Sequence, residues 1–158
     1  MKLTSKKMKL TARKMMRLFK IFVPYLGAGI KVTYISKDWS ELEVQMKLSW
    51  YNLNAFETHF GGSLYAMTDP HFALLLMQRI GHDYYVWDKS ASIDFVKPGL
   101  GIVKARFTLS QPEVDQVIAD AASGKPCYPE FDVEVQDEKG AVVARVHKIL
   151  YVKKKNGK

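Results

Sequence analysis

The stretch from Asn54 to Pro70, NAFETHFGGSLYAMTDP, combines residue types that can act on a carbonyl group. Gly61 and Gly62 begin an apolar, helix-like segment, and Asp69 lies within it. The first N–H groups of a helix have no partner inside the helix, and a glycine lets a carbonyl oxygen approach closely. Such an N–H stabilises an oxyanion, and a carboxylate acts as nucleophile or as general base on water. We therefore expect Gly61 to be the donor, Asp69 the reacting carboxylate, and Asn54 the group that orients the water or the carboxylate.

The spacing of Gly61 and Asp69 sets a condition on this site. They are eight positions apart, which is about 12 Å along one helix at ~1.5 Å per residue. A catalytic group must come within roughly 3–3.5 Å of the reacting atom. One chain therefore cannot bring both groups to one carbonyl, whereas an antiparallel helix of a second copy across a two-fold axis can. If the chain is an enzyme, we expect a dimer or a dimer of dimers.

Hydrophobic periodicity predicts the elements that position these residues. Alternating, β-branched runs predict strands at 30–36, 41–50, 84–96, 102–110, 129–137 and 141–152. Residues 61–80 predict a long helix that ends at Gly81 and is apolar on most sides, and residues 112–124 predict a short one. Turns between consecutive strands, including the one at KPGLG, favour antiparallel neighbours. The order predicts a single α+β domain in which an antiparallel sheet wraps around the long central helix.

Composition bounds the class of protein. A chain of 158 residues with 47% hydrophobic residues can bury a core without disulfides or metal. The single cysteine, Cys127, excludes an internal disulfide and suits a reducing compartment. No apolar run reaches the ~20 residues that a spanning helix requires. We expect a soluble, cytoplasmic protein.

The net charge of +8 belongs to the two ends of the chain. Residues 1–20 carry eight Lys or Arg and no acid, and residues 153–158 carry four Lys. Between them, residues 21–152 are acidic overall. No nucleic-acid-binding motif accompanies the basic residues, so no specific nucleic-acid partner is expected.

The basic N-terminal region, residues 1–26, predicts an amphipathic helix. Its apolar residues recur at roughly helical spacing: Met15, Met16, Phe19, Phe22, Val23 and Leu26. We expect this helix to pack on the domain, and contact with a membrane surface is the alternative.

The motif and the order of elements resemble the hotdog-fold acyl-CoA thioesterases, especially the phenylacetate-pathway type. Many of these enzymes carry the pattern N-x-x-G-x-x-H-G-G-x-x-x-x-x-x-D. Without gaps, Asn54, Gly61, Gly62 and Asp69 fall on its asparagine, both later glycines and its acid. The combination of THFGGSLYAMTDP with VWDK and IDFVKPG is similar to an uncharacterised, thioesterase-like branch of that superfamily.

This resemblance implies a hotdog domain over residues 27–153, followed by a basic tail at 154–158. It also implies hydrolysis of acyl-CoA or other acyl thioesters by a homodimer or homotetramer, without metal or cofactor. Relatives place substrate contacts, and a hydroxyl that orients water, in two segments of the chain. The corresponding residues here are His59, Phe60, Gly62, Ser63, Asp88, Lys89 and Ser90. Basic residues would meet the phosphates of coenzyme A.

Departures from the pattern keep a second class of function open. The histidine of the pattern is Phe60 here, with His59 shifted by one position, and its earlier glycine is Glu57. Pro70 after the acid is also unusual among these enzymes. Phe60 and Pro70 favour a non-catalytic relative that binds acyl-CoA or lipid.

Several of these residues also have structural interpretations. Asp69-Pro70 is a helix-start signal, with Asp as the N-cap, and would divide residues 61–80 into two helices. Gly61-Gly62 can form a turn, and Asp88 can form a solvated salt bridge with its neighbour Lys89.

The histidines near the motif carry weaker signals. His59 and Ser63 are four positions apart and could pair, but they lack the strand–turn–helix context of a hydrolase nucleophile. His59 is expected to line the pocket, and His71 to be a buried or interface group or a proton relay near Asp69. These residues match no zinc signature.

Overall fold

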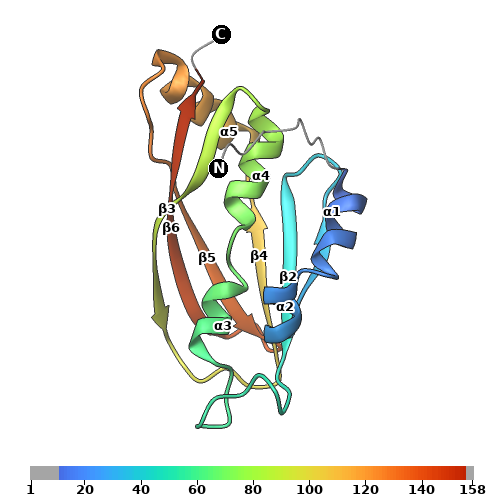
Figure 1. The fold of residues 1–158 in the computed structure, drawn as a ribbon. Coiled ribbons are helices and arrows are strands. Elements are labelled where there is room, and N and C mark those ends of the chain that lie inside the picture. Colours follow the sequence, from blue (N-terminus) through green and yellow to red (C-terminus); the bar gives the residue numbers. More distant parts are fainter. Residues whose placement is uncertain (1–10, 156–158) are drawn as a thin grey trace, which may run out of the picture.

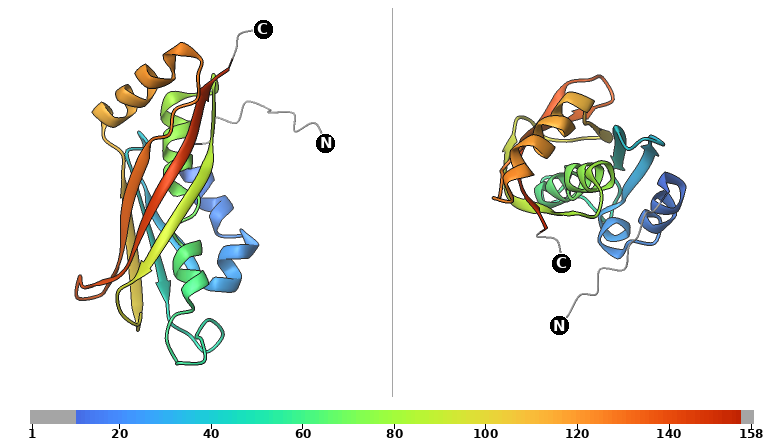
Figure 2. Two further views of the ribbon diagram at one scale, coloured as in Figure 1. Left: turned by 90° about the vertical axis from the view of Figure 1, so that its left-hand side faces the viewer. Right: turned by 90° about the horizontal axis from the view of Figure 1, so that it is seen from above.

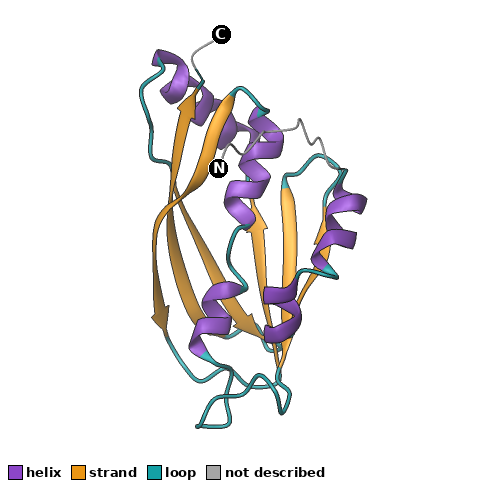
Figure 3. Ribbon diagram, in the orientation of Figure 1, coloured by secondary structure: helices purple, strands orange, loops and turns teal. Residues whose placement is uncertain are grey.

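The computed structural model describes residues 11–155, in which an antiparallel sheet curls around two central helices (Figures 1 and 3). The sheet has six strands in the order β1-β2-β4-β5-β6-β3. They are β1 (Ile30–Ile35), β2 (Glu41–Lys47), β3 (Tyr84–Phe95), β4 (Ile102–Thr108), β5 (Glu130–Asp137) and β6 (Val142–Lys154). This architecture confirms the predicted α+β class and its sheet wrapped around a central helical segment.

The helices divide into three groups around the sheet. The central pair is α3 (Gly61–Ala66) and α4 (His71–Ile80), and α5 (Gln111–Asp120) continues into a 3-10 turn at Ala121–Ser123. Seen from above, the sheet curves round the central pair, and α1 (Ala12–Phe19) and α2 (Val23–Ala28) lie beside β1 (Figure 2). The helix predicted at 112–124 is thereby confirmed, with a full capping box at its start.

The predicted N-terminal helix is in two pieces within the described residues, and its first ten residues lie outside them. The chain turns between Phe19 and Val23, and α2 ends at Gly29 in the left-handed conformation (φ 75°). Met15 and Phe19 pack against the core, as expected of an amphipathic helix. Ile21 between the helices remains 70% exposed.

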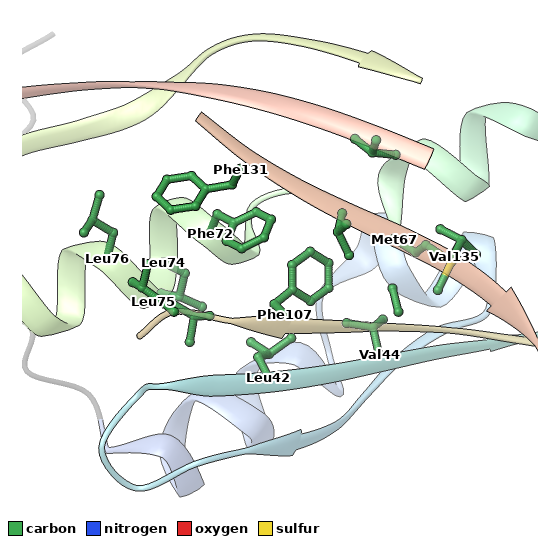
Figure 4. Close-up of a cluster of buried hydrophobic side chains, with 14 of the residues drawn as sticks. Leu42, Val44, Met67, Phe72, Leu74, Leu75, Leu76, Phe107, Phe131 and Val135 are labelled. Carbon is green, nitrogen blue, oxygen red and sulfur yellow. The ribbon is translucent and has the colours of Figure 1, made fainter. Parts of the chain in front are cut away.

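The core fills the space between α4 and the inner face of the sheet (Figure 4). Three phenylalanine rings make its centre: Phe72 of α4 stacks on Phe131 of β5, with ring centroids 4.8 Å apart, and meets Phe107 of β4 edge-on at 5.2 Å. Strand alternation places these rings inward because successive side chains point to opposite faces. The predicted burial of the apolar central segment holds for α4, in which five residues are buried, whereas Leu64 is the one buried residue of α3.

One predicted pairing is wrong: β3 and β4 are not neighbours. β3 pairs with β6 from Tyr84 to Phe95 and forms an edge of the sheet. The KPGLG segment crosses to β4 instead of making a tight turn. It is held by the loop before α3, because the His59 N–H donates to the Gly99 carbonyl at 3.0 Å. Sequence periodicity defines strands but does not show which strands pair.

The central aromatic cluster predicts where stability is concentrated. Phe107→Ala should lower the free energy of unfolding by about 3–5 kcal/mol, because it opens a cavity in a site with no exposed surface. Ile21→Ala, at an exposed site, should change it by no more than about 0.5 kcal/mol. Urea unfolding of both variants checks the difference. Equal losses would show that the core is not organised around these rings.

Candidate functional site

The central helical segment is interrupted at the residue predicted to be reactive. α3 ends at Ala66, α4 begins at His71, and Asp69 lies in the break, with a cis peptide bond to Pro70. The helix predicted over 61–80 is therefore two helices. Asp69 is not the N-cap of α4, however: that position belongs to Pro70, and no side chain caps the helix. The carboxylate of Asp69 is free to make another contact.

That contact is with a buried lysine. Lys148 Nζ lies 3.1 Å from Asp69 Oδ1 and 3.0 Å from Asp88 Oδ2. The Lys148 side chain has no exposed surface, whereas the side chains of Asp69 and Asp88 are 49% and 23% exposed. The Lys148 ammonium is thus buried and binds two carboxylates that come from different parts of the chain.

The strands explain how these groups meet. On β6 the inward positions are apolar at Val146, Leu150 and Val152, and Lys148 occupies the inward position between the first two. Asp88 is opposite Leu150 on the neighbouring β3. The sequence analysis missed Lys148. A lysine in an otherwise apolar alternation, within AVVARVHKILYV, is the signal that would have found it.

The charges of the three groups depend on one another. For Asp69, burial raises the pKa, but the hydrogen bond with Asp88 and the attraction of Lys148 outweigh it and hold the pKa below its usual range. For Asp88, burial and the neighbouring Asp69 raise the pKa to about 6. For Lys148, burial acts to lower the pKa, and the two carboxylates together keep it above its ordinary value. At neutral pH both acids are largely ionised, and Asp69 is the more exposed of the two.

A second buried group supports the backbone of Asp69 from the other side. The Tyr25 hydroxyl of α2 donates to the main-chain carbonyl of Asp69 and lies 2.9 Å from Nε2 of His71. Because the hydroxyl proton goes to the carbonyl, Nε2 of His71 carries the proton that it donates to Tyr25. Burial lowers the pKa of His71 to about 3, so the ring is neutral. His71 is buried, as one of its predicted alternatives stated.

The predicted oxyanion donor lies at a groove of about 520 Å³. Gly61 lines it with Leu64, Phe95 and the chain around Gly99. Within residues 11–155, no protein oxygen accepts the backbone N–H of Gly61. A Cβ at this position would lie 3.0 Å from the Phe95 ring, so a larger residue here would require that ring to shift.

Gly62 does not pack against the sheet. It is exposed, and a Cβ there would meet the ring of Phe60, 2.4 Å away. Phe60, which replaces the histidine of the motif, is the N-cap residue of α3 and its ring lies over Gly62. Gly61, not Gly62, is the glycine that faces a strand.

The loop before α3 is held together by Asn54. Its Nδ2 donates to Thr58 Oγ1 at 3.0 Å, and its Oδ1 accepts the N–H of Phe56 at 2.8 Å. In this arrangement both polar atoms of the amide hold the loop that leads to Gly61. An orienting role for Asn54 toward water or Asp69 stays a prediction.

His59 and Ser63 do not form the pair considered from the sequence. The His59 ring is buried, with Nε2 3.1 Å from the Gly101 carbonyl, and burial lowers its pKa. His59 does line the groove beside Gly61, as predicted. Ser63 lies in the first turn of α3.

The second predicted contact segment is rearranged by a bulge in β3 between Asp88 and Ser90. Lys89 is the extra residue, and its Nζ lies 4.0 Å from the centre of the Tyr128 ring. Asp88 therefore pairs with Lys148, and the alternative of an Asp88–Lys89 salt bridge is wrong.

The two halves of the predicted site are at different places in one chain. None of the residues that line the Gly61 groove belongs to the group formed by Asp69, Asp88 and Lys148. Gly61 is set against Phe95 at one end of β3, and Asp69 reaches Asp88 nearer the other end. This separation agrees with the spacing argument from the sequence.

Two further properties concern the described part of the chain only. Residues 11–155 contain no group of three or more His, Cys, Asp or Glu side chains arranged to hold a metal ion. None of their helices is long and apolar enough to cross a membrane.

The fold is that of hotdog proteins of the thioesterase type. A Pseudomonas aeruginosa protein of unknown function, described as a probable thioesterase, matches with a TM-score of 0.81 and 16% identity, over 94% of this chain and 99% of its own. A thioesterase from Haemophilus influenzae matches with a TM-score of 0.67 and 14% identity, over 94% of each chain. A mutant of the phenylacetic acid degradation protein PaaI from Thermus thermophilus matches with a TM-score of 0.56 and 25% identity, over 82% of this chain and 97% of its own.

The chain belongs to the family described as a domain of unknown function, DUF4442, whose model matches residues 11–152. None of the curated proteins matches the sequence. These findings confirm the resemblance to the hotdog thioesterase superfamily and to an uncharacterised branch of it.

The buried, neutral His71 predicts a dependence of stability on pH. Its pKa is about 3 in the folded chain and near 6.5 when unfolded, so the unfolded state binds the proton first as the pH falls. The neutral ring therefore contributes to the free energy of unfolding in full above the unfolded pKa, and this contribution is lost as the pH falls toward 3. Urea unfolding across this range should show a smaller loss for His71→Gln than for the wild type.

His82→Gln is the matched control, because it removes a histidine from the loop after α4 and should keep the slope of the wild type. Asp88 titrates in all three proteins, so the difference isolates His71. An unchanged slope in His71→Gln would contradict a neutral, buried ring.

Proposed function

We propose that this chain hydrolyses acyl thioesters, with acyl-CoA the expected substrate, at a site completed by two copies of the chain. One observation carries the proposal: a half-exposed carboxylate, Asp69, is held ionised at a break in the central helices by a buried ammonium. The motif acid of the hotdog thioesterases falls on this residue. The names of the similar structures support the reaction class.

The proposed chemistry uses groups of this chain alone. Asp69 either removes a proton from water or attacks the thioester carbonyl carbon itself. The negative charge that develops on the carbonyl oxygen is stabilised by the free N–H of Gly61. The C–S bond then breaks, the thiolate leaves and takes up a proton, and the acid is released. If Asp69 attacks, water hydrolyses the acyl-carboxylate intermediate in a second step.

The sheet edge supports a shared site. Gly61 is set against Phe95, and Asp69 is joined through Lys148 to Asp88. Phe95 and Asp88 are both on β3, about 20 Å apart along the strand at ~3.3 Å per residue. Within one chain, that separation is too long for a shared substrate atom.

A two-fold axis beside β3 removes the difficulty. Among the described strands, β3 pairs only with β6, so its other edge can pair with β3 of a second copy. In an antiparallel pair about an axis near Ala91 and Ser92, Asp88 of one copy lies beside Phe95 of the other. Asp69 then faces the Gly61 groove of the second copy.

The first test is a panel of acyl-CoA substrates with purified protein. Asp69→Asn should reduce kcat by about 10²–10⁴-fold, because the amide cannot act as base or as nucleophile. Asp115→Asn, at an exposed position on α5, is the control and should keep full activity. Saturable binding without turnover in the wild type would favour the non-catalytic acyl-CoA or lipid binder.

Mixing two inactive variants tests whether the site is shared. Gly61→Val crowds the Phe95 ring and blocks the groove, and Asp69→Asn removes the carboxylate. Refolded together, half of the dimers are mixed and each has one intact site, so about a quarter of the wild-type rate should return. Activity no greater than the sum of the separate variants would rule out a site built from two chains.

A further inference from the structure

Lys148 is the most unusually placed charge among the described residues. Its side chain is fully buried in the inward row of β6, where its neighbours are apolar. Two acids bond its ammonium, and the ring of Tyr65 lies 5.7 Å away. A buried lysine loses favourable hydration, which only close, well-placed anions offset. Since the ammonium has no exposed surface, it cannot touch a substrate.

We propose that Lys148 is a positioning residue: shared between Asp69 and Asp88, its ammonium fixes the Asp69 carboxylate at the helix break and keeps it charged. This inference rests on the proposed function for its catalytic meaning, but the effect on Asp69 is a property of the folded chain. Nothing in the motif of the resembling enzymes includes a residue at this position.

The number of charges gives Asp88 a role of its own. One cation faces two acids, so the group carries one negative charge when both acids are ionised and none when one holds a proton. Asp69 is the more exposed acid and keeps its charge, so Asp88 is the group that takes up the proton. When Asp88 is protonated, the whole field of Lys148 falls on Asp69 and makes it less basic.

Two titratable groups beside this cluster, His71 and Tyr25, keep constant charge near neutral pH. His71 on α4 is fully buried and neutral, and Tyr25 on α2 is a protonated donor whose pKa is raised by burial. Tyr65 of α3 faces the ammonium with its ring. Asp88 is therefore the group through which pH reaches Asp69 at mildly acid values.

A purely structural role does not explain the lysine. An apolar residue at 148 would continue the row formed by Val146 and Leu150, and apolar replacements of buried ion pairs are often neutral or stabilising. Asp69 would then be left next to Asp88 without a counter-ion. A buried lysine at this position is explained if its ammonium holds the partly exposed Asp69 carboxylate in place.

The test reads the titration of Asp69 directly, in the full-length protein, by NMR of the aspartate side-chain carboxyl carbons. The Asp69 signal is identified by its loss in Asp69→Asn. In the wild type it should titrate below its ordinary pKa, and in Lys148→Met above it, because two neighbouring acids then compete for one proton. Lys154→Met, at an exposed position on the same strand, should leave the titration unchanged.

A second pair of variants keeps the test valid if Lys148→Met does not fold. The first variant, Asp88→Asn, removes one acid. The second combines Asp88→Asn with Lys148→Met, so it removes the cation as well and leaves no buried charge at position 148. The Asp69 pKa should be higher in the double variant than in Asp88→Asn. Thermal unfolding confirms that both are folded.

Kinetics supply the second readout. Lys148→Met should lower kcat by roughly 10²-fold while KM stays nearly unchanged, because the ammonium positions the acid without touching substrate. The rate should rise through pH 6 in the wild type as Asp88 ionises, and this step should vanish in Asp88→Asn.

The outcomes separate the two proposals. An Asp69 titration that is the same with and without Lys148 overturns the positioning role, whatever the enzyme does. A raised KM with unchanged kcat also overturns it, because the lysine would then serve substrate binding. If no acyl-CoA is turned over but the titration shifts as stated, the positioning role stands and the proposed function fails.

Discussion

The site depends on a single ammonium buried under two carboxylates. Lys148 joins β6 to Asp88 on β3 and to Asp69 between the central helices. These three elements are far apart in the sequence and have no other polar link of this kind among the described residues. The three side chains also differ in exposure: the two acids are partly exposed and the lysine is not. Asp69, the most exposed member, is therefore the group of this cluster that is open to a ligand.

Hydrophobic periodicity accounts for most of what the sequence predicted about the fold. The strands, the apolar central segment and the helix after residue 110 follow from local patterns that the structure keeps. The pairing of β3 with β6 could not be predicted, because pairing depends on contacts between residues some sixty positions apart. The break at Asp69 was foreseen only as an alternative, through its proline.

The candidate site was predictable where a motif marks it and not elsewhere. Asp69 and Gly61 were found because their types and spacing suit chemistry at a carbonyl. Lys148 was missed because a lysine on a strand ordinarily faces water, although the apolar residues at the alternate positions Val146 and Leu150 mark position 148 as inward. Gly62 and Asn54 were also selected by the motif, but a position in a motif does not show which neighbours the residue contacts.

The hydrogen bond from Tyr25 to the backbone of Asp69 has a consequence for the role of helices α1 and α2. Because this hydroxyl comes from α2 and binds the main chain of Asp69 itself, the N-terminal helices support the backbone of the residue proposed to react. A shortened chain that begins at β1 would keep Asp69, Asp88 and Lys148 but would lose the Tyr25 hydroxyl that binds the Asp69 carbonyl. A ligand or surface that displaced these helices would break the hydrogen bond to the Asp69 carbonyl. It would thereby affect Asp69 from a distance, without entering the groove lined by Gly61.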